Sequence, residues 1–398
     1  MKRQILSAIL IFLPIASVLP QKKVDIFGYF ESQLMGARVR TDFIHMQSNK
    51  LRIDLESKWS EHVSFGANFD YITYHGKTRW AILDYLPETV TAVVPEDMRS
   101  LYVLPFDDRH FLDNAYLKLT IKYFDLTVGN QPISLGSGYA WNPTDLFNTQ
   151  DLLDPTYEQP GHNAIRLDVP IGTRYSLTAL YAPGEGWEDS GKLLQFKGRI
   201  SHFDYHLIAV EKTWRFHDYT QFNLDPLNPG FLELPEKRRM LGFSTAGELF
   251  GLGIWSECGY NWMETSDDFY EIVLGTDYTF DSGTYIVAEF YRNTLGKPDE
   301  GDYTLNDWMR YLVQEQKTIS RDQAYAIIQH PFTDLLTLGI STIYTFSDGS
   351  FALLPTLNYS PFENVEILTY INYYHGNHLA AFNKNLGNGG MIRARVYF

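Results

Sequence analysis

Strict alternation of apolar and polar residues is the dominant pattern along this chain. Residues 51–56 are Leu-Arg-Ile-Asp-Leu-Glu, and residues 117–122 and 392–398 alternate in a similar way. Successive side chains of a β-strand point to opposite faces, so each such segment has one apolar and one polar face. The alternation therefore predicts amphipathic strands rather than helices.

About eighteen segments carry this pattern, and sixteen is the alternative count. Their lengths suit tilted crossings of a bilayer, each of which needs ~9–11 residues. The predicted strands lie near residues 23–35, 48–59, 62–74, 112–122, 124–131, 162–169, 173–182, 191–200, 202–213, 238–248, 251–262, 268–280, 283–293, 322–331, 334–346, 349–359, 363–374 and 389–398.

The connections between these segments alternate in length. Every connection from an even-numbered to the next odd-numbered strand is short, and most of the others are long. Bacterial membrane barrels have short periplasmic turns and longer external loops, so the pattern predicts an all-β, antiparallel, up-and-down transmembrane barrel with both termini periplasmic. Short helices are predicted at 79–85 and 305–316. The long connections are predicted at 36–47, 75–111, 132–161, 183–190, 214–237, 294–321 and 375–388.

Aromatic residues gather beside the predicted short turns. This position favours an interfacial belt, where amphipathic rings are stable. The alternative interpretation is the ordinary β-propensity of Tyr and Phe. The predicted belt consists of Trp59, Tyr123, Phe124, Phe203, Phe250, Phe280, Tyr285, Phe332 and Phe362.

The physics of hydrocarbon requires the predicted sheet to close. An open sheet edge in a bilayer leaves backbone groups unpaired, at a cost of several kcal/mol each. The last predicted strand must therefore pair with the first. That pairing would bring Arg393 and Arg395 near Asp25, Glu31 and Gln33, and opposite charges on neighbouring strands attract.

Charged residues of both signs occupy the polar faces of the predicted strands. They could form a field that selects ions, or they could brace and solvate a polar lumen. For any single residue we favour bracing. The candidate lumen charges are Arg52, Asp54, Glu56, Arg166, Asp168, Arg199, Arg393 and Arg395.

The N-terminal sequence and the composition limit where the chain acts. Lys2 and Arg3 precede an apolar run, which predicts a secretory signal peptide at 1–20 and a barrel domain at 21–398; an N-terminal membrane helix is the alternative. Without these two basic residues, 31 basic face 48 acidic residues, a formal charge of −17. Such an acidic chain is not expected to bind nucleic acid. The single cysteine, Cys258, allows no internal disulfide.

The last residues resemble the sorting signal of outer-membrane barrels. The chain ends Arg-Ala-Arg-Val-Tyr-Phe, with the terminal aromatic Phe398. The resemblance implies that the barrel assembly machinery recognises this end and inserts the protein into the outer membrane. Outer-membrane lipids and lipopolysaccharide would then surround the barrel, and a homotrimer remains open as its assembly.

A second resemblance lies at 129–155. The segment contains Gly-Asn-Gln-Pro, then Gly-Ser-Gly, then Asn-Pro-Thr-Asp and finally Asp-Pro. It is similar to a loop of porin-like bacterial barrels in which Gly-Arg-Gln precedes Trp-Gly and Asn-Pro-x-Asp; here Asn130 and Leu135 replace the usual Arg and Trp. In porins of similar size the third external loop folds inward and narrows the pore. The resemblance implies that residues 132–161 do so here; the alternative is that Asn142 to Phe147 only pack the loop against the wall. The resemblance implies a negative constriction formed by Asp145, Asp151, Asp154 and Glu158.

A barrel of this size predicts a channel. Barrels of sixteen to eighteen strands leave an aqueous lumen, whereas eight strands are filled by side chains. The expected function is passive diffusion of small hydrophilic solutes or ions, without a cofactor, and the acidic balance predicts a mild cation preference. The alternatives are a barrel hydrolase, or a plugged barrel that acts as an adhesin, receptor or structural protein. No Gly-x-Ser-x-Gly or His-Glu-x-x-His sequence occurs.

Overall fold

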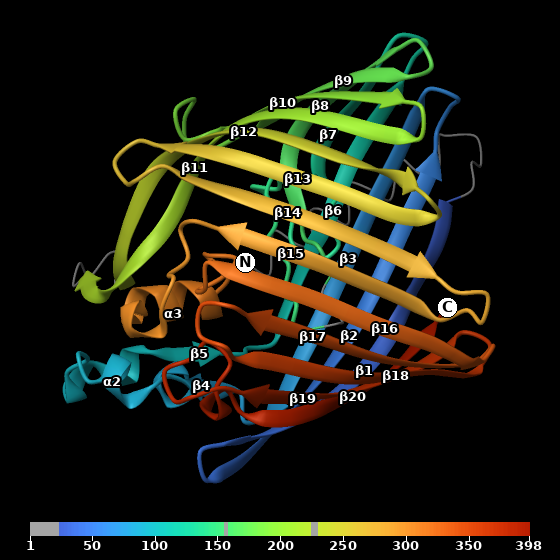
Figure 1. Ribbon diagram of the computed structural model, residues 1–398. Coiled ribbons are helices and arrows are strands. Elements are labelled where there is room, and N and C mark those ends of the chain that lie inside the picture. Colours follow the sequence, from blue (N-terminus) through green and yellow to red (C-terminus); the bar gives the residue numbers. More distant parts are fainter. Residues whose placement is uncertain (1–23, 155–157, 224–229) are drawn as a thin grey trace, which may run out of the picture.

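The computed structural model describes residues 24–154, 158–223 and 230–398, so the predicted signal peptide at 1–20 lies outside the described residues. Eighteen antiparallel strands of this part form one sheet, in which each strand pairs with its neighbours in the chain (Figure 1). The sheet closes because β1 pairs with both β2 and β20. The prediction of a closed barrel of about eighteen strands is confirmed.

Each predicted strand overlaps one strand of the barrel. At the closure, Glu31 lies opposite Arg395 in the ladder, and Arg395 Nη2 is 2.7 Å from Glu31 Oε2. The expected pairing of opposite charges across this seam is therefore confirmed. The barrel strands are β1 (Val24–Val39), β2 (Asp42–Lys58), β3 (Val63–Gly76), β6 (Arg109–Thr120), β7 (Asp125–Pro132), β8 (Gly161–Ile171), β9 (Tyr175–Ala182), β10 (Gly191–Ile200), β11 (Phe203–Asn223), β12 (Gly230–Leu249), β13 (Leu252–Met263), β14 (Phe269–Thr279), β15 (Tyr285–Asn293), β16 (Asp322–Thr333), β17 (Leu336–Thr345), β18 (Phe351–Phe362), β19 (Val365–His375) and β20 (Asn388–Tyr397).

Two of the predicted long loops are mostly strand. The predicted loop at 36–47 is a continuation of β1 and β2, which are separated by only two residues. The predicted loop at 214–237 is largely the far half of the β11–β12 hairpin, which projects beyond the other strands (Figure 1). Backbone pairing continues past the apolar band, where the outer face no longer needs apolar side chains. The alternation of apolar and polar residues therefore stops before the ends of these paired strands.

The connections after β3, β15 and β19 lie together at one end of the barrel (Figure 1). The predicted short helix at 79–85 is present only in part, as the 3-10 helix η1 (Ile82–Tyr85), because Arg79–Ala81 form the strand β4. The predicted helix at 305–316 is confirmed as the shorter α3 (Leu305–Leu312), which Thr304 caps. No helix within the described ranges is long and apolar enough to cross a bilayer. The other loop elements are α2 (Glu88–Thr91), η2 (Glu96–Leu101), β5 (Val103–Pro105), η3 (Glu300–Asp302) and η4 (Lys384–Leu386).

The outer face of the barrel is apolar. Leucines such as Leu194, Leu241 and Leu274 are about half exposed there, as a surface that contacts lipid requires. Most of the predicted belt is also exposed at the end with the short turns, and Phe250 is 94% exposed. The predicted belt position of Tyr285 is wrong, because this side chain lies on the inner face, where its hydroxyl donates to Asp277. The other exposed members of the belt are Trp59, Tyr123, Phe280, Phe332 and Phe362.

One side of the barrel interior is apolar rather than polar. The loop between β7 and β8 enters the barrel, and its Trp141 stacks on Tyr291 with ring centroids 4.9 Å apart. Trp141 belongs to a buried cluster with Val273, Val287 and other inner-face residues of β14 to β19. The expectation of a polar lumen is therefore wrong along this part of the wall, because the inserted loop needs an apolar surface to pack against.

A second apolar cluster joins the long connections to one another. Trp308 of α3 is fully buried against residues from the loop after β3, from β11 and from the loop after β19. The projecting hairpin is fixed to the same cluster, since Arg310 Nε donates to the carbonyl of His217 at 3.0 Å. The connections after β3, β15 and β19 thus form, with the projecting hairpin, a packed cap over one end of the barrel rather than separate loops.

Candidate functional site

Two buried carboxylates of the wall hold the first half of the inserted loop. Glu257 of β13 is fully buried. Its Oε1 accepts from the Thr144 amide at 2.6 Å and the Thr144 hydroxyl at 2.8 Å. Its Oε2 accepts from the amides of Ser137 at 2.6 Å and Gly138 at 3.3 Å. Consecutive amides that converge on one carboxylate form an anion-binding concavity, here made by the loop and filled by the wall.

Glu289 of β15 repeats this arrangement one step further along the loop. It is 3% exposed, and it accepts from the amides of Tyr139, Ala140 and Trp141 at 2.7, 3.0 and 2.9 Å. The indole of Trp255 donates to the same carboxylate at 2.6 Å. Hydrogen bonds to a charged acceptor are among the stronger ones in proteins. Residues 137–144 are therefore fixed to the barrel by two side chains.

Asp145, one of the four predicted constriction acids, is 2% exposed. Its carboxylate accepts from the amides of Phe147 and Asn148 at 2.8 and 3.0 Å, and from the amide of Leu135 at 3.3 Å. The side chain of Asn148 donates to it at 2.8 Å. The charge of Asp145 is thus used to fold the loop.

Glu158 lies near the end of the same loop and contacts the opposite part of the wall. Its carboxylate is 2.8 Å from Lys50 Nζ, 3.5 Å from Arg52 Nη1 and 3.1 Å from Arg395 Nη2. The hydroxyl of Tyr29 donates to it at 2.8 Å. Burial opposes ionisation, but the nearby cations and the hydroxyl prevail and lower the pKa of Glu158 to about 2.

Most of the candidate lumen charges are paired with opposite charges of the barrel wall. Around the closing seam, Arg52 is 2.9 Å from Asp54 and Arg393 is 3.0 Å from Glu366. Further round the barrel, Arg166 is 2.8 Å from Asp168.

Two candidate lumen charges lie outside these interior pairs. Arg199 lies next to a short turn, exposed, and it pairs with Asp204 at 2.7 Å. Glu56 is exposed and lies opposite Asp25 and Gly66 in the ladders.

Asp151 and Asp154 line two cavities in the barrel interior. A cavity of about 610 Å³ lies against β16 to β20, and both acids line it together with Glu366 and Arg393. A second cavity, of about 270 Å³, is lined by the same two aspartates. The structure thus brings this pair together at one point of the barrel interior.

The Asp151 carboxylate is bonded to neutral groups. It accepts from the amide of Leu153 at 2.9 Å and from the Gln314 side chain at 3.2 Å. Burial and the adjacent Asp154 raise the pKa of Asp151.

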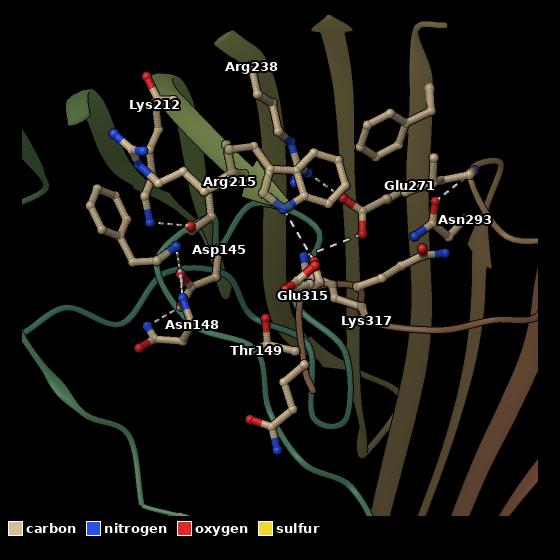
Figure 2. A pocket seen from close by; sticks show the side chains of 18 residues that line it. Asp145, Asn148, Thr149, Lys212, Arg215, Arg238, Glu271, Asn293, Glu315 and Lys317 are labelled. Carbon is tan, nitrogen blue, oxygen red and sulfur yellow. Dashed lines mark hydrogen bonds and ion pairs between the residues drawn. The ribbon is translucent and has the colours of Figure 1, made fainter. Parts of the chain in front are cut away.

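A third cavity, of about 350 Å³, lies between the inserted loop, β11 to β15 and the segment after α3. Figure 2 shows Lys212, Arg238 and Glu271 reaching it from the wall, and Lys317 from the segment after α3. Its cations are already engaged: Arg238 Nη2 is 3.0 Å from Glu271, and Lys317 Nζ donates to the carbonyl of Asn142 at 2.6 Å. The cavity therefore couples the inserted loop to the cap through polar contacts.

No sequence pattern marks the residues that fix the loop. Glu257 and Glu289 occur on the alternating polar faces of their strands and resemble any other lumen charge. Their partners are backbone amides, which have no sequence signature. Within the described ranges, no group of three or more His, Cys, Asp and Glu side chains is placed to hold a metal ion.

Comparison with solved structures places the fold among known barrels. No protein-family model matches the sequence, and no curated protein matches it. A BenF-like porin from Pseudomonas fluorescens Pf-5 is 9% identical, with 96% of this chain and 99% of that chain covered and a TM-score of 0.57. OccAB2 of Acinetobacter baumannii is 10% identical, with 94% and 98% covered and a TM-score of 0.57. OccK5 (OpdH) of Pseudomonas aeruginosa is 11% identical, with 94% and 97% covered and a TM-score of 0.53. At this level of identity the similarity is one of fold.

Proposed function

We propose that this protein is a porin-like channel of a Gram-negative outer membrane, through which small hydrophilic solutes diffuse passively with a preference for cations. The observation that carries the proposal is that Asp151 and Asp154 line two interior cavities of the barrel. Both acids belong to a loop that is fixed inside the barrel, as a constriction must be. The fold similarity to a BenF-like porin supports the same conclusion.

The charges at this point favour cations. Three acids, Asp151, Asp154 and Glu366, line the larger cavity. Among the described residues of that lining, Arg393 is the one lysine or arginine. A ring of acids in a narrow aqueous passage attracts cations and repels anions. Of the four predicted acids, we assign the constriction to Asp151 and Asp154, and we assign Asp145 and Glu158 to bracing the loop. The paired charges of the wall, such as Arg52 with Asp54, brace the lumen.

The location follows from the outer face and the two ends of the barrel. The apolar band would contact outer-membrane lipids, with the cap exposed to the cell exterior beside lipopolysaccharide and both termini in the periplasm. Residues 1–20 would be removed as a signal peptide during export. Phe398 would serve as the signal for the barrel assembly machinery; in the folded barrel its amide donates to the carbonyl of Gly28 at 3.0 Å. A homotrimer is the assembly that we would test first.

Single-channel recording in a planar bilayer tests the proposal. The refolded protein should conduct steadily, with a reversal potential under a KCl gradient that indicates cation preference. The Asp151→Asn, Asp154→Asn double variant should lower the cation-to-anion permeability ratio about two- to fivefold. The matched control is Asp97→Asn, an exposed acid of the cap, which should leave the ratio unchanged. A folded barrel that never conducts would overturn the proposal.

A plugged barrel that acts as a receptor or adhesin is the second candidate function. The observation in its favour is the cap, whose buried cluster around Trp308 joins several of the long connections. A cap of this kind would present a rigid surface to partners outside the cell. The same single-channel recording separates the two candidate functions, because a folded barrel with a plugged pore should not conduct.

A further inference from the structure

The smaller of the two cavities that Asp151 lines has aromatic side chains in its wall. Trp80 and Tyr85 reach it from the cap, and Tyr370 and Tyr374 reach it from β19. The rings of Trp80 and Tyr85 are stacked, with centroids 5.9 Å apart. Its volume of about 270 Å³ lies near the lower end for ligand pockets, which run from ~300 to 1,000 Å³. The cavity therefore suits a small ligand.

The charge of this cavity is negative. Asp151 and Asp154 line it, and no lysine or arginine occurs among the described residues that do so. Asp151 accepts hydrogen bonds only from neutral groups in the contacts given above, and its raised pKa fits a carboxylate without a cationic partner. The cavity thus offers aromatic side chains and carboxylate oxygens. Besides the two aspartates and the three tyrosines, its titratable lining residue is His45.

We propose that this cavity binds small organic cations, with a quaternary or other alkylated ammonium group held between the aromatic rings and the Asp151–Asp154 pair. Cations are attracted to the faces of Trp and Tyr, and aromatic cages recognise quaternary ammonium ligands in this way. The proposal names a substrate class for the constriction and so rests on the proposed channel. A bare divalent metal ion fits less well, because Ca²⁺ and Mg²⁺ need six or more oxygen ligands. An anion would meet the carboxylates of Asp151 and Asp154 in a cavity that no lysine or arginine of the described residues lines.

Binding of choline to the refolded full-length barrel in detergent micelles tests the site. Its neutral isostere, 3,3-dimethylbutan-1-ol, has the same shape without the charge and serves as the ligand control. Isothermal titration calorimetry should detect choline, and it should detect the isostere at least about tenfold more weakly. Equal binding of the two compounds, or no choline binding, would overturn the inference.

Matched variants locate the site. Asp151→Asn and Trp80→Leu should each weaken choline binding about tenfold. Their controls are Asp97→Asn and Trp187→Leu, an exposed acid and an exposed tryptophan of other loop segments, which should bind choline as the parent does. Heat-modifiable migration on gels checks the folding of each variant, and Tyr370→Leu replaces Trp80→Leu if that variant does not fold. Unchanged affinity in both folded site variants would contradict the inference.

Bilayer recording with choline chloride separates the failure of this inference from the failure of the channel. Conductance in KCl without choline binding would overturn the cation site and leave the channel intact. Choline binding to a barrel that never conducts would support the site and overturn the channel. Choline currents that fall in Asp151→Asn and persist in Asp97→Asn would support both.

Discussion

The inserted loop is held at two places by opposite arrangements of charge. In its first half, the wall supplies the carboxylates Glu257 and Glu289, and the loop supplies backbone amides. In its last part, the loop supplies the carboxylate of Glu158, and the wall supplies the cations Lys50 and Arg395. The first contact is dry and the second is about one-third exposed at Glu158.

This difference indicates which contact fixes the position of the loop and which contact changes in strength with pH and ionic strength. A buried carboxylate bonded to several amides cannot release them without leaving orphan donors in a dry site, at about 1–3 kcal/mol each. A partly exposed ion pair is screened by salt and contributes less. We therefore expect the amide contacts to set the position of the loop, and the ion pairs to adjust it with pH and ionic strength.

Removal of one wall carboxylate should have the largest effect. Glu289→Ala leaves the amides of Tyr139, Ala140 and Trp141 and the indole of Trp255 without their acceptor. We expect the free energy of unfolding to fall by about 4 kcal/mol, which allows for water entering the site. Urea unfolding in detergent measures the loss. The open-channel current should also become larger and noisier, because the loop is no longer fixed.

Glu248→Ala is the matched control for this variant. Glu248 is exposed beside a short turn, on a neighbouring part of the barrel. Its removal should change the unfolding free energy by less than about 0.5 kcal/mol. An equal loss in the two variants would mean that Glu289 acts through general charge rather than through the loop amides.

Glu257→Gln should have an intermediate effect. The amide of glutamine keeps one oxygen acceptor, but its NH₂ group faces the donors that Glu257 satisfied, either Thr144 or Ser137 and Gly138. We expect a loss of about 2 kcal/mol in the free energy of unfolding. Glu257→Ala should lose more than Glu257→Gln in the same urea titration. A Glu257→Gln variant that is as stable as the parent would contradict this expectation, because the charge would then contribute nothing in this site.

The strands could be predicted from the sequence because the two faces of each strand meet different solvents. Lipid outside and polar groups or loop inside impose a period of two wherever the strand is in the membrane. The pattern was lost at 36–47 and 214–237 because these hairpins extend beyond the lipid, where pairing is the only constraint. The predicted Tyr285 belt position was wrong because a ring beside a short turn can point to either face.

The site was predicted only in outline. The glycine- and proline-rich segment at 129–155 indicated the inserted loop, and its four acids were chosen together. Their separate roles depend on the fold: Asp145 bonds its own turn, Glu158 meets wall cations, and Asp151 lines two cavities. The aromatic residues at the same cavity form two pairs, Trp80 with Tyr85 and Tyr370 with Tyr374, which lie more than 200 residues apart in the chain. No local pattern relates such positions.

The ion-pair contact should be the weaker one and the one that depends on pH. Glu158 has a folded pKa of about 2, below its ordinary value of 4.5. A lowered pKa stabilises the folded state above the ordinary value, and this contribution is lost as the pH falls from about 4.5 toward 2. Because the side chain is one-third exposed, solvent screening reduces the effect to about 1 kcal/mol. Urea titrations at pH 6 and pH 2.5 should show this loss in the parent.

Glu158→Gln isolates this contribution, because the variant has no carboxylate to protonate at that position. It should be about 1 kcal/mol less stable than the parent at pH 6, and this difference should fall to roughly a quarter of that value at pH 2.5. Salt at 1 M should reduce the difference at pH 6, since the Debye length falls to ~3 Å, whereas the loss in Glu289→Ala should persist. If salt instead removed both differences equally, the distinction between a dry contact and a screened one would be wrong.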